Sequence, residues 1–346
     1  MKLISRQNRF ITIFYLLIIF VFLTNFSFIN KVKLKVTANN VHISNGITPT
    51  FTYQEISGIG KDSIYNRRDN SDIIKVGDTY YVWYSRMDSP ITSGYWATIW
   101  YATSEDEGHT WQEQGEALGL GKQGNFDSHS VFTPNILAFK GKYYLYYTGV
   151  QPTPGNTKGK FEGNHTTDFT AIGLAVSDSP DGPFKRVANN PVLENSKTPE
   201  NFDSYRIDDA SLLVKDNKIW LYYKGRSIVH GKKGPKLTEM SVAYSDQPEG
   251  PYTKHKGPLL KKSHEVLIWK KGKGVASLAS ISKSINYAED GVHFSTLVDN
   301  LSKIPKAPGL YRPDLEDDNL NLETPGWGIA MKVKKGEAYL VRFEMN

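Results

Sequence analysis

The sequence contains no cysteine, no cluster of histidines and no regular Asp-x-Asp loop. The absence of cysteine excludes disulfide bonds and a lipid-modified cysteine, so burial of apolar side chains has to hold the fold together. The absence of metal-ligand spacings gives no indication of a dedicated metal site, so no cofactor is expected to be required. Long apolar runs are equally scarce, and the most prominent one lies at the N-terminus.

This N-terminal run follows three basic residues. Lys2, Arg6 and Arg9 precede the uncharged, mostly apolar stretch FITIFYLLIIFVFL at 10–23, which is typical of a secretory leader. The run is short for a membrane span and no clear A-x-A site follows it, so residues 1–29 are interpreted as either a signal peptide or an N-terminal membrane anchor. Both interpretations predict a periplasmic or secreted protein. Residues 30–60 are interpreted as a linker and entry segment.

Composition favours an all-β fold for the rest of the 346 residues. The chain has 20 Tyr, 7 Trp, 29 Gly and 17 Pro, a mixture typical of short strands joined by tight turns. The net charge is +6, and seven lysines lie between residues 254 and 273. These lysines are interpreted either as solvated loop residues or as a positive rim that attracts an anionic polymer. Nucleic acid is a poor fit as a partner for an exported protein.

Two kinds of hairpin alternate along the chain. The first kind has an aromatic-rich second strand, as in KVGDTYYVWYSR (75–86), FKGKYYLYYTG (139–149) and VKDNKIWLYYKGR (214–226). The second kind turns on Ser, Asp and Gly, and its first copy at 104–111 resembles the structural Asp-box of sialidase-type propellers. Four strands recurring about every 60 to 75 residues are typical of propeller blades. We therefore predict a five-bladed β-propeller over residues 61–346.

Polar residues at the start of each blade's first strand are the functional candidates, because the innermost strands line the central channel. The five blades offer Asp69 and Asp72; Asp127, His129 and Thr133; Arg206, Asp208 and Asp209; His264 and Glu265; and Arg312. Ungapped alignment on the aromatic strands superposes Asp69 with Asp208, and Asn70 with Asp209 and Thr133. A channel that collects carboxylates suits glycoside hydrolysis, which needs one protonated and one ionised carboxyl group.

Four stretches carry a more specific resemblance. In order, RRDNSDIIKVGDTYYVWYSR, SVFTPNILAFKGKYYLYYTG, IDDASLLVKDNKIWLYYKGR and HEVLIW resemble glycoside hydrolase family 117 and its kin around family 43, which are five-bladed propellers. The resemblance implies a catalytic base at Asp69 or Asp72, a pKa-modulating acid at Asp208 or Asp209, and a proton donor within the pair His264 and Glu265. Related propellers hold calcium or magnesium in the channel, which leaves an axial or structural ion open.

The predicted activity is that of an exo-acting, inverting glycoside hydrolase that acts on oligosaccharides. The resemblance implies release of a terminal α-linked sugar, such as 3,6-anhydro-L-galactose, from algal galactan fragments. Thr133, Asp127, His129, Arg206 and Arg312 are the candidate substrate-binding residues. The alternatives are a propeller phosphorylase, which would need basic residues beside the acid, and a glycan-binding propeller without catalysis. A helical Ser-x-Ala-x-x-Arg element found in family 117 has no match in residues 30–64, so the oligomeric state is left open.

Overall fold

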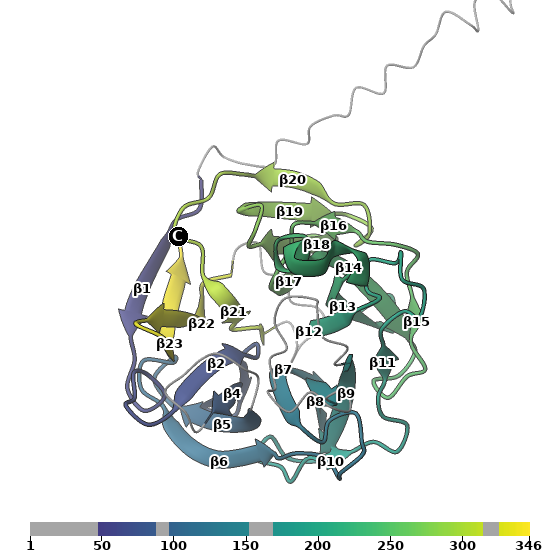
Figure 1. Cartoon of the computed structure of the whole chain (residues 1–346). Coiled ribbons are helices and arrows are strands. Elements are labelled where there is room, and N and C mark those ends of the chain that lie inside the picture. Colours follow the sequence, from purple (N-terminus) through teal and green to yellow (C-terminus); the bar gives the residue numbers. More distant parts are fainter. Residues whose placement is uncertain (1–47, 88–96, 152–168, 314–324) are drawn as a thin grey trace, which may run out of the picture. The chain divides into compact units, whose positions relative to one another are not determined.

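Five antiparallel β-sheets surround a common axis in the computed structural model (Figure 1). The structure describes residues 48–87, 97–151, 169–313 and 325–346. The interpretation of residues 1–29 as a leader lies outside this range. Within the described residues, no helix combines the length and the apolar character needed to span a membrane. The sheets are the blades of a β-propeller, which confirms the predicted all-β, five-bladed fold.

In blades 1 to 4 the strands follow the chain from the axis outward. Blade 1 contains β2 (Asn66–Asn70), β3 (Ile74–Val76), β4 (Thr79–Met87), β5 (Thr98–Ser104) and β6 (Gln112–Leu118). Blade 2 contains β7 (Ser130–Phe139), β8 (Lys142–Gln151), β9 (Phe169–Ser177), β10 (Lys185–Arg186) and β11 (Leu193–Glu194). Blade 3 contains β12 (Arg206–Lys215), β13 (Lys218–Arg226), β14 (Glu239–Ser245), β15 (Thr253–Lys254) and β16 (Leu260–Lys261). A short 3₁₀ helix, η1 (Ile228–Lys236), follows β13.

The last two blades complete the ring. Blade 4 contains β17 (Val266–Lys271), β18 (Gly274–Ala279), β19 (Ser284–Ala288) and β20 (Ser295–Val298). Blade 5 contains β21 (Lys306–Leu310), β22 (Trp327–Lys334), β23 (Glu337–Met345) and, as its outer strand, β1 (Phe51–Glu55). Strand β1 pairs antiparallel with β23 from Phe51 opposite Met345 to Glu55 opposite Val341. The first and last described strands therefore close the ring in one sheet.

Aromatic side chains fill the space between the blades, as the alternating pattern of the hairpins predicts. Trp83, Tyr84, Tyr146, Tyr222 and Tyr223 are each fully buried. One cluster of buried residues extends through blades 1, 2 and 3, and a second joins blades 4 and 5. Because the core lies between blades, the inner strands are held in place on both sides.

The turn between β5 and β6 has the geometry of the predicted Asp-box. The Asp106 carboxylate accepts hydrogen bonds from the amides of His109 and Thr110, at 3.1 and 2.8 Å. The Trp111 indole donates to the carbonyl of Gly108 at 2.9 Å. These bonds hold the pKa of Asp106 at about 2 even though burial opposes the shift. The motif is confirmed as structural, because its polar groups are used within the turn.

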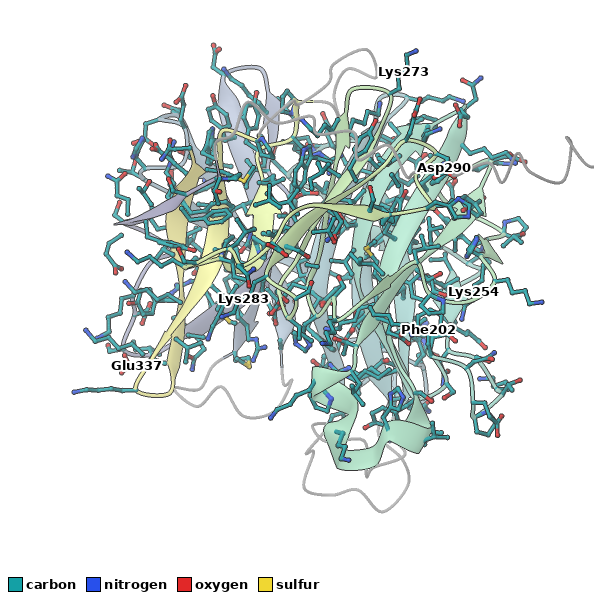
Figure 2. All side chains as sticks on the ribbon, turned by 90° about the horizontal axis from the view of Figure 1, so that it is seen from above. Phe202, Lys254, Lys273, Lys283, Asp290 and Glu337 are labelled. Carbon is teal, nitrogen blue, oxygen red and sulfur yellow. The ribbon has the colours of Figure 1, made fainter. Side chains whose placement is uncertain are left out.

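The lysines at 254–273 do not form one continuous rim. Strand β17 runs from Val266 to the turn that contains Lys273, so this lysine lies about 20 Å along the strand from His264 and Glu265. Figure 2 shows Lys273 at the top and the helix η1 at the bottom, on opposite faces of the propeller. Lys270, Lys271 and Lys273 therefore cannot share one positive rim with the lysines that precede His264.

Candidate active site

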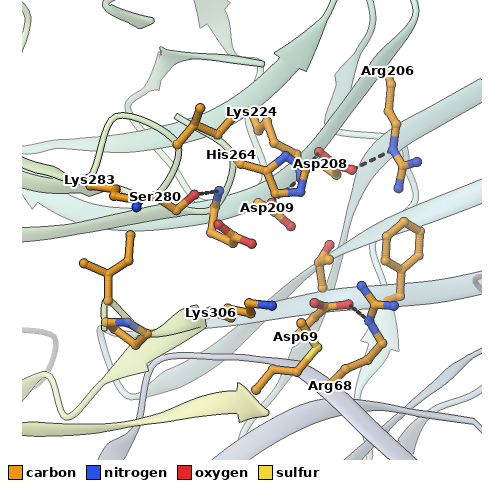
Figure 3. A pocket seen from close by; sticks show the side chains of 17 residues that line it. Arg68, Asp69, Arg206, Asp208, Asp209, Lys224, His264, Ser280, Lys283 and Lys306 are labelled. Carbon is orange, nitrogen blue, oxygen red and sulfur yellow. Dashed lines mark hydrogen bonds and ion pairs between the residues drawn. The ribbon is translucent and has the colours of Figure 1, made fainter. Parts of the chain in front are cut away.

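A pocket of about 480 Å³ opens onto the propeller axis, at the end where the inner strands begin (Figure 3). A smaller space of about 30 Å³ continues from it toward the axis. Each blade contributes two or three residues to the lining of this deeper space, and the first of them in each blade are Asp69, Thr133, Asp209, Glu265 and Ala307. The five inner strands therefore each contribute one residue at an equivalent position, and three of the five are carboxylic acids.

β-Bulges direct these residues toward the axis. Asp69, Thr133, Asp209 and Ala307 have φ values of 48°, 44°, 53° and 41°. Each stands where the pairing of its inner strand with the next strand shifts register. A bulge turns one side chain out of the normal alternation. Positive φ is strained for Thr and Ala, so its recurrence in four blades marks a functional position. In blade 4, Glu265 reaches the same place from the residue before β17.

The structure corrects the alignment of the blades by one residue. Asp69 is equivalent to Asp209 and Thr133, whereas ungapped counting superposes it with Asp208. The cause is a second register shift in blade 1: Asn70 pairs with Tyr84 but Ile74 pairs with Tyr81. Blade 1 therefore holds one extra residue between its bulge and its turn, a feature that counting along the sequence does not reveal.

The neighbours Asp208 and Asp209 have different environments. Asp208 is buried between Arg206 and Lys224, with side-chain contacts of 2.6 and 3.1 Å. The charge of Lys224 and then that of Arg206 outweigh burial and lower the pKa of Asp208. Asp209 contacts only Lys224 among these cations, at 2.5 Å. Burial, with the negative charges of Asp208 and Asp69, raises the pKa of Asp209 to about 7. Asp209 can therefore carry a proton near neutral pH, and Asp208 cannot.

His264 and Glu265 both line the pocket. The positive charge of Lys224, followed by burial, lowers the pKa of His264 to about 2. The imidazole is therefore neutral at any working pH, and its Nδ1 lies 3.5 Å from the hydroxyl of Thr238. The Glu265 backbone amide donates to Ser280 Oγ at 3.3 Å, which leaves the Glu265 carboxyl group directed at the pocket. Of the pair, only Glu265 has a carboxyl group, the kind of group that glycoside hydrolysis uses for acid–base catalysis.

Asp72 and Arg312 are placed differently from the expectation. Both are buried, and neither lines the pocket among the described residues. Arg312 donates to Asp72 at 3.2 Å and to the carbonyl of Ile268 in blade 4 at 2.7 Å. Asp72 also accepts from the amide of Leu310 in blade 5 at 2.8 Å. Asn135 of blade 2 donates to the carbonyl of Ala210 in blade 3 at 2.8 Å. This polar belt joins all five inner strands and closes the axis beneath the pocket.

Blade 5 begins earlier in the chain than the sequence pattern suggests, and for this reason Arg312 does not line the pocket. The sequence GLYRPD suggests that blade 5 begins near residues 309–314, but β21 begins at Lys306. Pro308 and Gly309 conceal the strand, since both are unusual inside a sheet. A Cβ at Gly309 would stand 1.8 Å from the carbonyl oxygen of Ser71. Glycine is therefore required where blades 1 and 5 meet. In strand β21, Lys306 lines the pocket, and Ala307 and Pro308 line the deeper space.

Asp127 and His129 also lie outside the pocket lining. Asp127 is buried, accepts a hydrogen bond from Tyr147 Oη at 2.8 Å and pairs with Arg186 at 2.6 Å. Blade 3 repeats the arrangement, because Asp203 accepts from Tyr223 at 3.2 Å. The Phe-Asp-Ser sequence that recurs at 126–128 and 202–204 is a signal for this structural role. The expectation that Asp127 and His129 face the channel is therefore wrong, since this loop packs on the second strand of its own blade.

Thr133 and Arg206 do line the pocket. The Thr133 hydroxyl bonds to that of Thr148 at 2.6 Å, and Arg206 is 2% exposed with its charge directed at Asp208. Arg206 thus contributes mainly by holding Asp208.

Sequence reasoning missed several pocket residues. The pocket is also lined by Arg68, Phe132, Lys224, Ser280, Ile281, Lys283, Ile304, Pro305, Lys306 and Met331. Lys224 could have been identified from its position in the sequence. It occupies a position that Ser85 and Thr148 hold in blades 1 and 2, since these residues pair with Arg68, Phe132 and Asp208 at corresponding places. A lysine replacing a small hydroxyl beside two acids indicates a charged centre.

Within the described ranges, no group of three or more His, Asp or Glu side chains is placed to hold a metal ion. The Arg312 guanidinium supplies a positive charge near the axis, where it contacts Asp72 and a backbone carbonyl.

The raised pKa of Asp209 predicts that the stability of the fold depends on pH. Its carboxyl group has an ordinary pKa of 3.8 and a folded-state pKa of about 7, so its contribution to stability is present below pH 4 and is lost as the pH rises through 7. Asp209→Asn, which stays uncharged, should raise the melting temperature at pH 8 by about 1 to 3 °C and have a smaller effect at pH 5.

Thermal unfolding of both proteins at the two pH values measures this difference. Asp216→Asn is the matched control, because Asp216 also has positive φ (54°) but lies in the exposed β12–β13 turn. A melting temperature that falls at pH 8, or that shifts equally at both pH values, would contradict the assignment.

Comparison with protein families gives a match to "Glycosyl hydrolases family 43" over residues 63–243. This region contains the inner strands of blades 1, 2 and 3, with Asp69 and Asp209. A comparison with curated protein sequences finds no significant match.

Solved structures show the same fold. A family 117 glycoside hydrolase produced by the marine bacterium Zobellia galactanivorans has a TM-score of 0.74 and 28% identity, with 87% of this chain and 92% of that chain covered. A thermostable family-43 glycoside hydrolase has a TM-score of 0.54 and 16% identity, covering 85% and 92%. An endo-arabinase from Bacteroides thetaiotaomicron has a TM-score of 0.53 and 15% identity, covering 84% and 97%. The last two likenesses show the fold alone.

Proposed function

The chain belongs to glycosyl hydrolases family 43, and we propose that it is an exo-acting, inverting hydrolase that removes a terminal α-linked sugar from algal galactan oligosaccharides. The observation that carries the proposal is the axial pocket, where blades 1, 3 and 4 each direct one carboxyl group at the same space. The family 117 relative comes from a marine bacterium, and this supports an algal substrate. A terminal 3,6-anhydro-L-galactose is the sugar proposed.

The closed end of the pocket supports exo-action. Asp72 and Arg312 block the axis below the acids, with relative exposures of 1% and 0%. A pocket closed at its inner end accepts the end of a chain, whereas an endo-acting enzyme needs a groove open on both sides. The pocket lining also includes the apolar side chains of Ile281, Ile304 and Met331. Apolar side chains suit the apolar face of a sugar ring, while the carboxyl groups of the pocket meet the hydroxyls.

The roles of the acids follow from their environments. We assign Asp69 as the general base: it lies on blade 1, pairs with Arg68 at 2.6 Å and has the pocket in front of it. Glu265 lies on blade 4, which is not adjacent to blade 1 in the ring, so a water molecule and a sugar can lie between the two groups, as inversion requires. Glu265 then gives its proton to the leaving oxygen as Asp69 removes one from water.

Asp209 and Lys224 support this transfer. The protonated Asp209 can donate a hydrogen bond to a sugar hydroxyl, and its ionised form disfavours ionisation of a neighbouring acid. Lys224 bridges Asp208 and Asp209 and keeps His264 neutral. His264 is therefore assigned a hydrogen-bonding role toward substrate, and Glu265 the role of proton donor.

We further propose that the reaction needs no metal ion and that the protein works in the periplasm or outside the cell. The axial position of Arg312, which already provides a fixed positive charge, supports the first point. The basic and apolar stretch at 2–23 supports the second.

Product analysis tests the proposed function. Neoagaro-, carrageenan-, porphyran- and fucose-containing oligosaccharides are incubated with the protein, with and without phosphate and with and without EDTA, and products are followed by NMR. Release of one monosaccharide with inverted anomeric configuration, unchanged by phosphate or EDTA, is expected. Products of many lengths would overturn exo-action, a sugar 1-phosphate would indicate a phosphorylase, and binding without turnover would indicate a glycan-binding propeller.

A further inference from the structure

The pocket contains more positive charge than its own carboxylates neutralise. Its lining includes five cationic side chains (Arg68, Arg206, Lys224, Lys283 and Lys306) and four acids (Asp69, Asp208, Asp209 and Glu265). Three of the cations are used internally: Arg68 pairs with Asp69, Arg206 with Asp208, and Lys224 with both Asp208 and Asp209. Lys283 and Lys306 have no acidic partner among the described residues.

These two lysines come from neighbouring blades. Lys283 lies in the turn between β18 and β19 of blade 4, and Lys306 is the first residue of β21 in blade 5. Both are exposed. Figure 3 shows the Lys306 side chain extending toward the Asp69 side of the pocket, while Lys283 lies beside Ser280. They therefore stand at the rim of the pocket, between solvent and the acids.

A neutral sugar would gain little binding free energy from Lys283 and Lys306. Covering an ammonium group with neutral substrate removes water from it without an opposite charge in return, which is unfavourable. An anionic substituent on the sugar makes the same contact favourable, because its charge pairs with the ammonium groups while the sugar displaces water. The hydrolytic steps themselves are assigned to Asp69, Asp209 and Glu265 and do not use Lys283 or Lys306.

We propose that Lys283 and Lys306 form an anion-recognising subsite that selects oligosaccharides carrying a sulfate or carboxylate group next to the sugar cleaved. The inference rests on the proposed hydrolase function and specifies its substrate class. The anion lies on the substrate beside the scissile bond, and the lysines bind it without entering the chemistry.

The test compares three ligands: a sulfated galactan oligosaccharide, the same oligosaccharide after desulfation, and a uronate-bearing oligosaccharide. Binding is measured by calorimetry and turnover by product analysis, each at low and at high salt. Wild type should bind an anionic ligand at least about tenfold more tightly than the neutral one, and added salt should reduce the preference. Which anionic ligand is preferred identifies the substituent.

The variants Lys283→Met, Lys306→Met and the double substitution keep the length of the side chains and remove their charge. The preference should fall about threefold to tenfold in each single variant and disappear in the double variant, with the change in KM rather than in kcat. Lys273→Met is the matched control, since this lysine lies at the far end of blade 4. It should retain the preference and its salt dependence.

The outcomes separate the inference from the proposed function. A lysine-dependent binding preference without turnover of any ligand would support the subsite and overturn the hydrolase. Efficient turnover of the neutral oligosaccharide, with the anionic ones rejected or with a preference that survives in the double variant, would overturn the subsite and leave the hydrolase. Turnover that requires inorganic phosphate would assign the lysines to a phosphate site and overturn the inference.

Discussion

Asp69→Asn is expected to lower kcat/KM on the oligosaccharide substrate by about 10³-fold or more, because asparagine cannot take a proton from the attacking water. The change removes the charge but keeps the size of the side chain. Asparagine also tolerates the left-handed backbone (φ 48°) that the bulge imposes. The protein should therefore fold normally and still bind substrate, with the loss in kcat. Steady-state kinetics and calorimetric binding measure the two effects separately.

The control for this variant is again Asp216→Asn, which makes the same change at a positive φ of 54° in a remote turn. It should retain full activity. Substantial turnover by Asp69→Asn would show that another group activates the water.

Replacement of Asp72, the other base candidate from the sequence, should instead lower the stability of the fold. Its carboxylate accepts hydrogen bonds from the amide of Leu310 and from Arg312, and Asp72→Ala would remove both of these buried interactions.

Glu265→Gln should separate protonation of the leaving group from the attack of water. On the oligosaccharide, whose leaving oxygen needs a proton, kcat should fall by about 10²- to 10⁴-fold. On an aryl glycoside of the same sugar with an acidic phenol as leaving group, the loss should be far smaller, since the phenolate leaves without protonation. Asp69→Asn should lose activity on both substrates, because both need activated water.

Comparison of the two substrates therefore assigns the acid. Glu289→Gln, at an exposed position in blade 4, is the matched control and should behave like wild type on both. Equal losses on both substrates by Glu265→Gln would mean that Glu265 is not the proton donor. In that case Asp209, whose pKa burial raises to about 7, would be the next candidate.

Several features of the site were predictable because they are local in sequence. The alternation of two hairpin types predicted five blades. The place where each blade begins predicted that acids of blades 1, 3 and 4 would converge on the axis, but left open Asp69 or Asp72 in blade 1 and Asp208 or Asp209 in blade 3. The Asp-box was predictable for the same reason, since Ser104, Asp106 and Trp111 bond within one turn. These patterns repeat because every blade packs against its neighbours in the same way.

Other features depend on contacts between distant segments. The second register shift in blade 1 is visible only in the pairing of β2 and β3 with β4, and it changes which Asp of blade 3 corresponds to Asp69. The burial of Asp72 depends on Arg312, which is 240 residues away. Asp127 is directed away from the axis by Tyr147 and Arg186. The spacing of residues along the sequence does not reveal any of these contacts.

The amino-acid sequence by itself was enough to identify an all-β propeller, the glycoside hydrolase class and the acids from which a catalytic pair can be drawn. The folded chain was needed to divide those acids into pocket groups and structural groups. The physical reason is that strand periodicity and turn chemistry act over a few residues, whereas the protonation state and direction of a carboxyl group depend on every charge around it. For Asp208 and Asp209, adjacent in the chain, Lys224 and burial shift the two pKa values in opposite directions.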